Sequence, residues 1–108
     1  MRPIDPPVIE EAVRLLLGAA PPGSKVILFG SHARGTADAR SDLDLMVIEP
    51  EVGDRWAEIK RLEDVLDPLR VPVDLLVASQ ERFDYWRETP NTVYYRAVKE
   101  GRIYESLP

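Results

Sequence analysis

The chain has 108 residues, which is enough for one small domain with a hydrophobic core and too few for a second catalytic domain. Its hydrophobic share of 44% is typical of a globular protein and argues against disorder. The 14 Lys and Arg against 19 Asp and Glu give a net charge of -5. This balance argues against a broad basic face for nucleic acid, and it leaves open a cation-dependent pocket or a basic protein partner.

The sequence contains no cysteine, which excludes a disulfide framework, a thiolate zinc site and a cysteine nucleophile. No segment approaches the length of a membrane span. Asp5, Glu10 and Glu11 do not fit the positively charged start of a signal peptide. We therefore expect an unprocessed, soluble and cytoplasmic protein that does not engage a membrane.

The first half of the chain predicts a helix, a strand, a polar loop and a second strand. Residues 5–18 have proline in the first turn, apolar residues at helical spacing and a final glycine, and they predict the helix. Residues 25–29 are rich in β-formers and predict a short strand. Residues 30–41 are small and polar, with room for one helical turn, and residues 42–48 predict the second strand.

The second half predicts a helix that begins at Asp54 and ends at Pro68, followed by a strand over 72–77. A helix capped by Ser79 is expected to run to about Trp86. A last helix begins at Asn91 or Thr92 and ends at Gly101, and residues 102–105 predict a short strand. Trp56 shares an apolar stripe with Ile59, Leu62 and Leu66, so we expect it in the core. The elements predict one α/β (α+β) domain over residues 1–108, a small sheet with helices packed mainly on one face.

Three carboxylates occupy strand positions that a core would fill with apolar residues. Asp42 and Asp44 alternate with apolar residues, so they share one face of the second strand, and Asp74 takes the same face of the third. If these strands are neighbours, the three carboxylates meet and require a cation. Mg²⁺ prefers such oxygen ligands, and pairs of these ions serve phosphoryl and nucleotidyl transfer. Taken singly, each Asp also fits a solvated strand edge or a surface ion pair.

The polar loop begins with Gly30-Ser31, where a glycine permits close approach of an oxyanion and the serine offers a hydroxyl and an amide. This pair fits a phosphate cradle, although it is neither a Walker loop nor a dinucleotide fingerprint. Arg34 and Arg40 fit phosphate oxygens, and Arg34 equally fits a role of holding the loop through a carbonyl or carboxylate. His32, the one histidine, is interpreted as structural.

Gly30-Ser31, ten further residues, Asp42-x-Asp44 and then a strand-borne Asp74 resemble the signature of the DNA polymerase beta-like nucleotidyltransferases. Within that superfamily the runs Phe-Gly-Ser-His-Ala-Arg-Gly and Ser-Asp-Leu-Asp-Leu resemble the minimal nucleotidyltransferases, MntA-type antitoxins that pair with HEPN-domain toxins. The resemblance implies the nucleotidyltransferase fold, with a small mixed sheet. It also implies nucleotide-binding roles for Gly30 and Ser31, with Arg34 as a further nucleotide-binding residue.

The same resemblance implies that Asp42, Asp44 and Asp74 are the catalytic residues and hold two Mg²⁺ ions, and that Asp74 also helps to activate the acceptor hydroxyl. It implies transfer of AMP from ATP to a hydroxyl, on a tyrosine of a HEPN-domain toxin, which silences that toxin. Because 108 residues leave little beyond the predicted site, we expect the acceptor to come from another protein or from a second copy of this chain. Direct binding of nucleic acid is not expected.

Two alternatives stay open at this point. The chain could neutralise its partner by occlusion without catalysis, or it could be the nucleotidyltransferase subunit for a small-molecule acceptor. A late group of aromatic residues also has two interpretations, packing against the sheet or a partner surface; its members are Tyr85, Trp86, Tyr94 and Tyr95.

Overall fold

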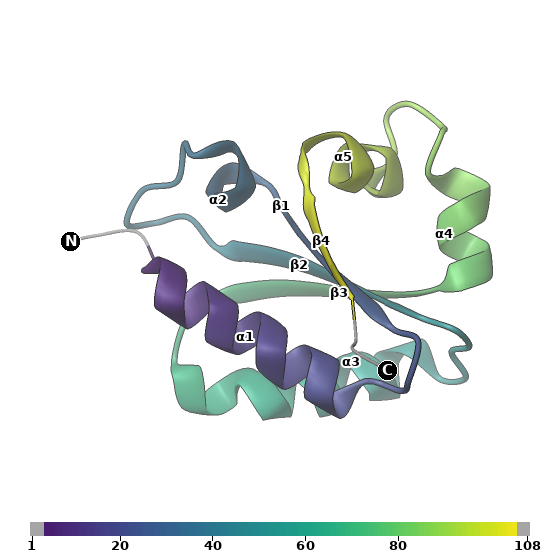
Figure 1. Ribbon diagram of the computed structural model, residues 1–108, viewed down its shortest axis with the longest axis horizontal. Coiled ribbons are helices and arrows are strands. Elements are labelled where there is room, and N and C mark those ends of the chain that lie inside the picture. Colours follow the sequence, from purple (N-terminus) through teal and green to yellow (C-terminus); the bar gives the residue numbers. More distant parts are fainter. Residues whose placement is uncertain (1–3, 106–108) are drawn as a thin grey trace.

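The computed structural model describes residues 4–105 of the chain (Figure 1). Its elements follow in the order α1 (Pro6–Ala19), β1 (Lys25–Phe29), α2 (Ser31–Arg34), β2 (Leu43–Glu49), α3 (Arg55–Leu66), a short 3-10 helix (Asp67–Leu69), β3 (Val73–Ser79), α4 (Gln80–Trp86), α5 (Val93–Glu100) and β4 (Arg102–Glu105). Each predicted helix and strand is present close to its predicted residues.

Local capping explains where three of the helices begin. The side chains of Asp54, Ser79 and Thr92 accept backbone N–H bonds at the starts of α3, α4 and α5. Asp5 precedes α1 without such a bond, and proline in the first turn marks this start instead. Because these signals are local, the sequence alone was enough to place them.

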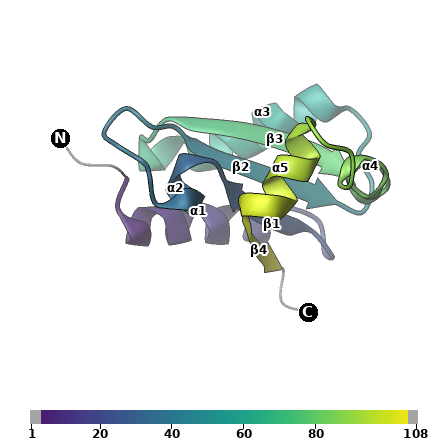
Figure 2. The same cartoon turned by 90° about the horizontal axis from the view of Figure 1, so that it is seen from above.

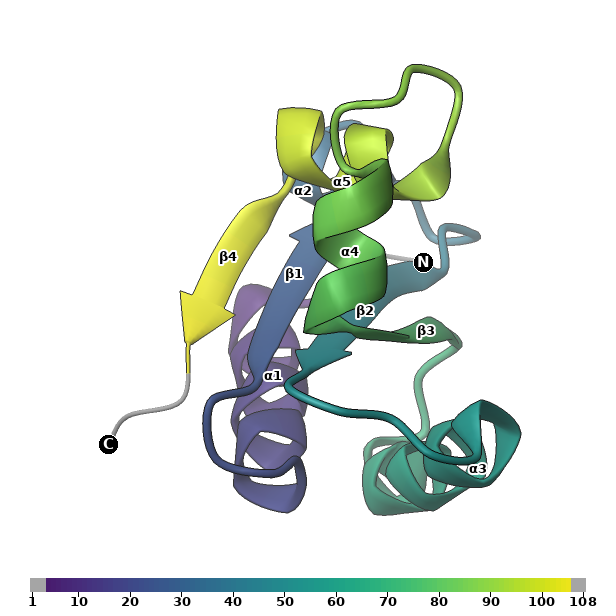
Figure 3. The same cartoon turned by 90° about the vertical axis from the view of Figure 1, so that its right-hand side faces the viewer.

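The four strands form one mixed sheet in the order β3-β2-β1-β4 (Figure 3). β1 pairs antiparallel with both β2 and β4, while β2 and β3 run parallel. The parallel pair is joined through α3, as a parallel connection requires. The register sets Phe29 opposite Asp44 on one side of β2 and Asp74 opposite Asp44 on the other.

Helices cover both faces of this sheet. The two longest helices, α1 and α3, lie on one face, where they enclose a core that includes Leu16, Leu45 and Leu62 (Figure 1). On the opposite face α4 and α5 pack over a second cluster that includes Phe29 and Phe83. The sequence predicted helices mainly on one face of the sheet, and α1 and α3 fulfil this prediction. It did not include the second, smaller core under α4 and α5. The site lies on the face of the second core.

The placement of Trp56 in the core was wrong. Its side chain is 71% exposed, and the guanidinium of Arg55 lies 5.1 Å from its ring centroid. The buried side of α3 is formed by Leu62 and Leu66, while Trp56 lines a groove beside β3, one of the two edge strands of the sheet. An apolar stripe on a helix does not show whether another element covers its first turn.

The late aromatic residues differ in their burial, and a partner surface formed by the exposed ones stays a prediction. Tyr94 packs edge-to-face against Phe83 in the second core, with ring centroids 6.5 Å apart. Tyr85 is 73% exposed and contacts Trp86 at a centroid distance of 4.8 Å. Within residues 4–105, no helix is long and apolar enough to cross a membrane.

Candidate active site

The structure brings the predicted carboxylates to one end of one sheet face. Asp44 and Asp74 are directly opposite each other on the parallel strands β2 and β3, and Asp42 immediately precedes β2. The face is the predicted one, because Leu43 and Leu45 belong to the core on the far side. Asp44 is half-buried, while Asp42 and Asp74 are exposed. The chain therefore places one sheltered carboxylate between two that face solvent.

Burial and neighbouring charges act on the pKa of Asp44. Burial raises the pKa of the Asp44 carboxyl, and the nearby charge of Asp74 raises it further. Arg96 acts in the opposite direction and favours the ionised form, whereas Asp42 again raises this pKa. His32 provides a further, smaller opposing effect. The charges of Asp74 and Asp42 therefore both act on the Asp44 carboxyl.

Gly30 lies directly beneath the sheltered carboxylate. Its φ of +75° is in the region that favours glycine, and a Cβ built on it would lie 2.0 Å from Asp44 Oδ2. The antiparallel pairing of Phe29 with Asp44 produces this approach, since Gly30 is the next residue after the strand. A side chain at position 30 would therefore displace the carboxylate of Asp44, and only glycine leaves it in place.

Gly30 also leads into α2, a single helical turn of four residues that begins at Ser31. The backbone N–H groups of Ala33 and Arg34 donate to the carbonyl of Gly30. The loop that follows is closed by His32, whose Nε2 lies 3.2 Å from the carbonyl oxygen of Ser41. This contact agrees with the structural interpretation of the histidine.

Arg34 is exposed, and its side chain pairs with a carboxylate near the C-terminal end of the chain. Its Nη1 donates to Glu100 Oε1 at 3.0 Å and to Oε2 at 3.1 Å. The backbone N–H of Gly30 donates to the same Oε1 at 3.0 Å. Arg96, one turn earlier on α5, has its Nε 3.6 Å from that oxygen. In this structure Arg34 therefore holds the loop to a carboxylate, which was the alternative interpretation of this residue.

Sequence reasoning missed Arg96 and Glu100. Their spacing of four residues on a predicted helix is a recognisable ion-pair signal. Nothing in that spacing reveals that Glu100 also reaches Arg34, which is 66 positions away in the chain. The pairing arises because α2 and α5 lie on the same side of the sheet, as the view from above shows (Figure 2). Arg40, by contrast, is exposed in the loop, where its backbone N–H donates to Asp38.

The donor set at this end of the sheet suits a hard divalent cation. Asp42, Asp44 and Asp74 offer only oxygen atoms, and within residues 4–105 none of the three is in an ion pair. The described residues contain no group of three or more His, Cys, Asp or Glu already gathered around one metal position. The fit therefore rests on the register, which sets Asp44 opposite Asp74, and on the repulsion between two like charges, which a cation between them would relieve.

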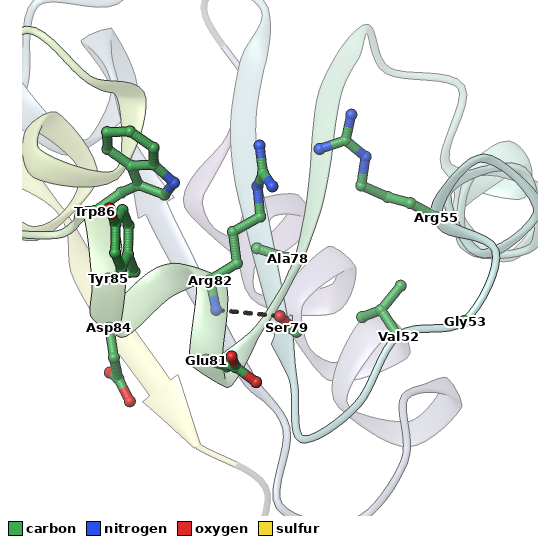
Figure 4. Close-up of a pocket in the computed structure, with 10 residues that line it drawn as sticks. All are labelled: Val52, Gly53, Arg55, Ala78, Ser79, Glu81, Arg82, Asp84, Tyr85 and Trp86. Carbon is green, nitrogen blue, oxygen red and sulfur yellow. Dashed lines mark hydrogen bonds between the residues drawn. The ribbon is translucent and has the colours of Figure 1, made fainter.

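Two hollows lie near the edge strand β3. A groove of about 410 Å³ runs along β3, and its walls include Asp74, Trp56 and Tyr94. A wider hollow of about 880 Å³ lies between the start of α3 and α4; its lining includes Arg55, Arg82 and Tyr85 and none of the three aspartates (Figure 4). Only the groove along β3 opens onto a predicted site residue.

Comparison with known proteins agrees with this geometry. The model of the nucleotidyltransferase domain family matches residues 9–104. The solved structure of a toxin-antitoxin with AMP-PNP is 25% identical with a TM-score of 0.61, over 90% of this chain and 73% of that chain. A structure of the toxin-antitoxin MntA-HpeT is 23% identical with a TM-score of 0.55, over 91% of this chain and 72% of that chain.

A third solved structure is a tri-AMPylated Shewanella oneidensis HEPN toxin in complex with MNT antitoxin. It is 20% identical with a TM-score of 0.52, over 91% of this chain and 70% of that chain. A search of curated proteins finds no significant match. The family model and these structures confirm the resemblance and the fold class that the sequence predicted.

Proposed function

The chain belongs to the nucleotidyltransferase domain family, and from that premise we propose that it transfers AMP from ATP to a tyrosine hydroxyl of a HEPN-domain toxin and thereby acts as an antitoxin. The proposal treats residues 1–108 as one domain that works in the cytoplasm. It is supported by the similarity to a toxin-antitoxin with AMP-PNP and to a complex in which a HEPN toxin is tri-AMPylated.

The observation that carries the proposal is the register of the site. Asp44 stands opposite Asp74 across two parallel strands, and its carboxylate lies over Gly30, which only a glycine permits. The stability of the fold does not require this arrangement, because two carboxylates that face each other, one of them half-buried, lower the free energy of unfolding. A nucleotide bound with divalent cations gives the arrangement a use.

We assign the metal-binding role to Asp42, Asp44 and Asp74 and the nucleotide-binding role to Gly30, Ser31 and Arg34. Mg²⁺, when bound, supplies positive charge that neutralises the phosphates and lowers the pKa of an oxygen ligand. The chain's own contribution is to orient: the register fixes two carboxylates, and α2 presents Ser31 and Arg34 beside them.

In the proposed reaction the oxygen of the acceptor hydroxyl forms a bond to the α-phosphorus of ATP. The bond from that phosphorus to the oxygen bridging the α- and β-phosphates breaks, and pyrophosphate leaves with the bonding electrons. The hydroxyl proton passes to a carboxylate, and we assign this role to Asp74, which is exposed and lines the groove along β3. Because Asp74 also lines the groove along β3, that groove is the approach for the acceptor side chain.

The proposal is tested with the purified chain, Mg²⁺, ATP labelled at the α-phosphate, and a HEPN-domain toxin as the acceptor. We expect label on the HEPN protein, and we expect Asp44→Asn to reduce the rate at least a hundredfold while circular dichroism stays unchanged. The matched control is Asp64→Asn, an exposed aspartate of α3 paired with Lys60 and remote from the site. Undiminished labelling by Asp44→Asn would overturn the assignment.

Neutralisation by occlusion is separated from catalysis by a cellular experiment. Asp42→Ala removes a proposed metal ligand from an exposed position, so it should leave the fold and any docking surface in place. Under the proposal this variant no longer protects cells that express the toxin. Protection at the wild-type level would assign the antitoxin effect to occlusion.

A further inference from the structure

Glu100 occupies the donor groups that face the candidate active site from α2 and α5. Its carboxylate accepts from the Gly30 N–H and, at both oxygens, from Arg34, while Arg96 lies 3.6 Å away. The Glu100 side chain is only 18% exposed. One carboxylate thus gathers two guanidinium groups and a backbone amide that come from three separate positions in the chain.

The same donors are of the kind that bind a nucleotide phosphate. A carboxylate and a phosphate present oxygen pairs to a guanidinium in the same way, through parallel N–H bonds. Gly30 is moreover close to two acidic side chains, with Asp44 against its Cα and Glu100 on its amide. A triphosphate that reached Arg34 would therefore meet a negative charge already in place.

We propose that Glu100 is a built-in competitor of the nucleotide: in the free protein it holds Arg34 and Arg96, and the triphosphate binds only when the Glu100 side chain leaves them. This inference rests on the proposed function and adds to it a residue that sets nucleotide affinity. Release needs no movement of the helix, because Glu100 is the last residue of α5 and its side chain can turn about its own bonds.

The competing interpretation is that Glu100 positions Arg34 for the phosphates. The two roles predict opposite effects of Glu100→Gln, which keeps the size of the side chain and an acceptor for the Gly30 amide but removes the charge. If Glu100 is a competitor, removing its charge leaves Arg34 and Arg96 free for the phosphates, so the dissociation constant of the nucleotide should fall about tenfold. A positioning residue that is removed leaves Arg34 less ordered, and the dissociation constant should rise.

The chain contains a close control for this variant. Glu58 also pairs with one arginine through both oxygens, and the pair Glu58–Arg61 is 17% and 48% exposed against 18% and 46% for Glu100–Arg34. It lies on α3, on the other face of the sheet. Glu58→Gln removes an ion pair of the same kind and should leave the dissociation constant unchanged.

The experiment is calorimetric titration of the full chain with AMP-PNP and Mg²⁺. We expect Glu100→Gln to bind about tenfold more tightly than the wild type, and Arg34→Gln to weaken binding more in the Glu100→Gln background than in the wild type, because there Arg34 serves only the nucleotide. Glu100→Ala repeats the test without an acceptor. Equal or weaker binding by both Glu100 variants would overturn the inference.

Two further outcomes have defined meanings. If the wild type binds AMP-PNP but both Glu100 variants lose their circular dichroism spectrum, Glu100 belongs to the structure of the fold and the inference is wrong, while the proposed function stands. If no form of the chain binds AMP-PNP, the proposed function and the inference fail together.

Discussion

Replacing Gly30 by alanine tests the geometry of the site most directly. A Cβ at this position would lie 2.0 Å from Asp44 Oδ2 and 2.9 Å from Asp44 Cγ, so the Asp44 side chain must turn away. The backbone, at φ +75° and ψ -157°, is in a region that only glycine occupies readily, which costs about 1–3 kcal/mol for any other residue. We therefore expect Gly30→Ala to lower the free energy of unfolding by roughly 2 kcal/mol.

The effect on activity should be larger than the effect on stability. An alanine at position 30 moves a carboxylate by about an ångström or more, and misplacement of that order costs about a hundredfold in rate. Gly35 is the matched control, because it has a φ of +78° at the other end of α2 and no atom within 4 Å of a built Cβ. Gly35→Ala should cost about 1–2 kcal/mol of stability and leave the transfer rate within a few-fold of the wild type.

Urea unfolding followed by circular dichroism gives the two stabilities, and transfer of labelled AMP gives the two rates. The expected pattern is a similar loss of stability in both variants with a large loss of activity only in Gly30→Ala. If Gly30→Ala transferred AMP as fast as Gly35→Ala, the position of the Asp44 carboxylate over Gly30 would have no part in the reaction, and the reasoning from register to function would be refuted.

Two other predictions concern stability. Burial, together with the hydrogen bond that the protonated Glu49 donates to the Glu58 carboxylate, raises the pKa of Glu49 to about 8. The stability that depends on this proton is therefore complete below pH 4.5 and is lost as the pH rises through 8. Glu49→Gln should therefore match the wild type in urea near pH 5 and exceed its stability by a few kcal/mol near pH 8, and equal stabilities at both pH values would contradict this. Trp56→Ser should change the free energy of unfolding by less than about 0.5 kcal/mol, because the ring is exposed. Leu62 is fully buried, so Leu62→Ala should lower the free energy of unfolding by about 2–5 kcal/mol. Similar losses in the two variants would place Trp56 in the core after all.

The elements were predictable because their signals are local. A capping residue followed by an apolar stripe is contained in a dozen consecutive positions, as Asp54, Ser79 and Thr92 show. The alternation in β2 and β3 likewise gave the face on which Asp44 and Asp74 lie, since side chains alternate whatever the partner strand is.

The remaining features depend on how distant segments meet. The exposure of Trp56 follows from the position of α3 beside the edge strand β3, and the helical pattern alone does not contain that information. The second core requires α5 to pack over β1, and no local sequence pattern indicates this packing. The contact between Arg34 and Glu100 depends on the same packing, so the sequence offered a basic residue near the site without its acidic partner.

The charges at the site also constrain the order in which a nucleotide can be accommodated. Asp44 and Asp74 repel a triphosphate that arrives without a cation, and Glu100 adds a further negative charge on the opposite side. The positively charged side chains of Arg34 and Arg96 are already paired with Glu100, so they attract a free nucleotide only weakly at long range. A nucleotide already bound to its divalent cation is attracted by the aspartates first, and its phosphates then compete with Glu100 for the two arginines at short range. Under this scheme removing the charge of Glu100 strengthens the second contact and leaves the first unchanged, so we expect Glu100→Gln to change nucleotide affinity without changing its dependence on the divalent cation.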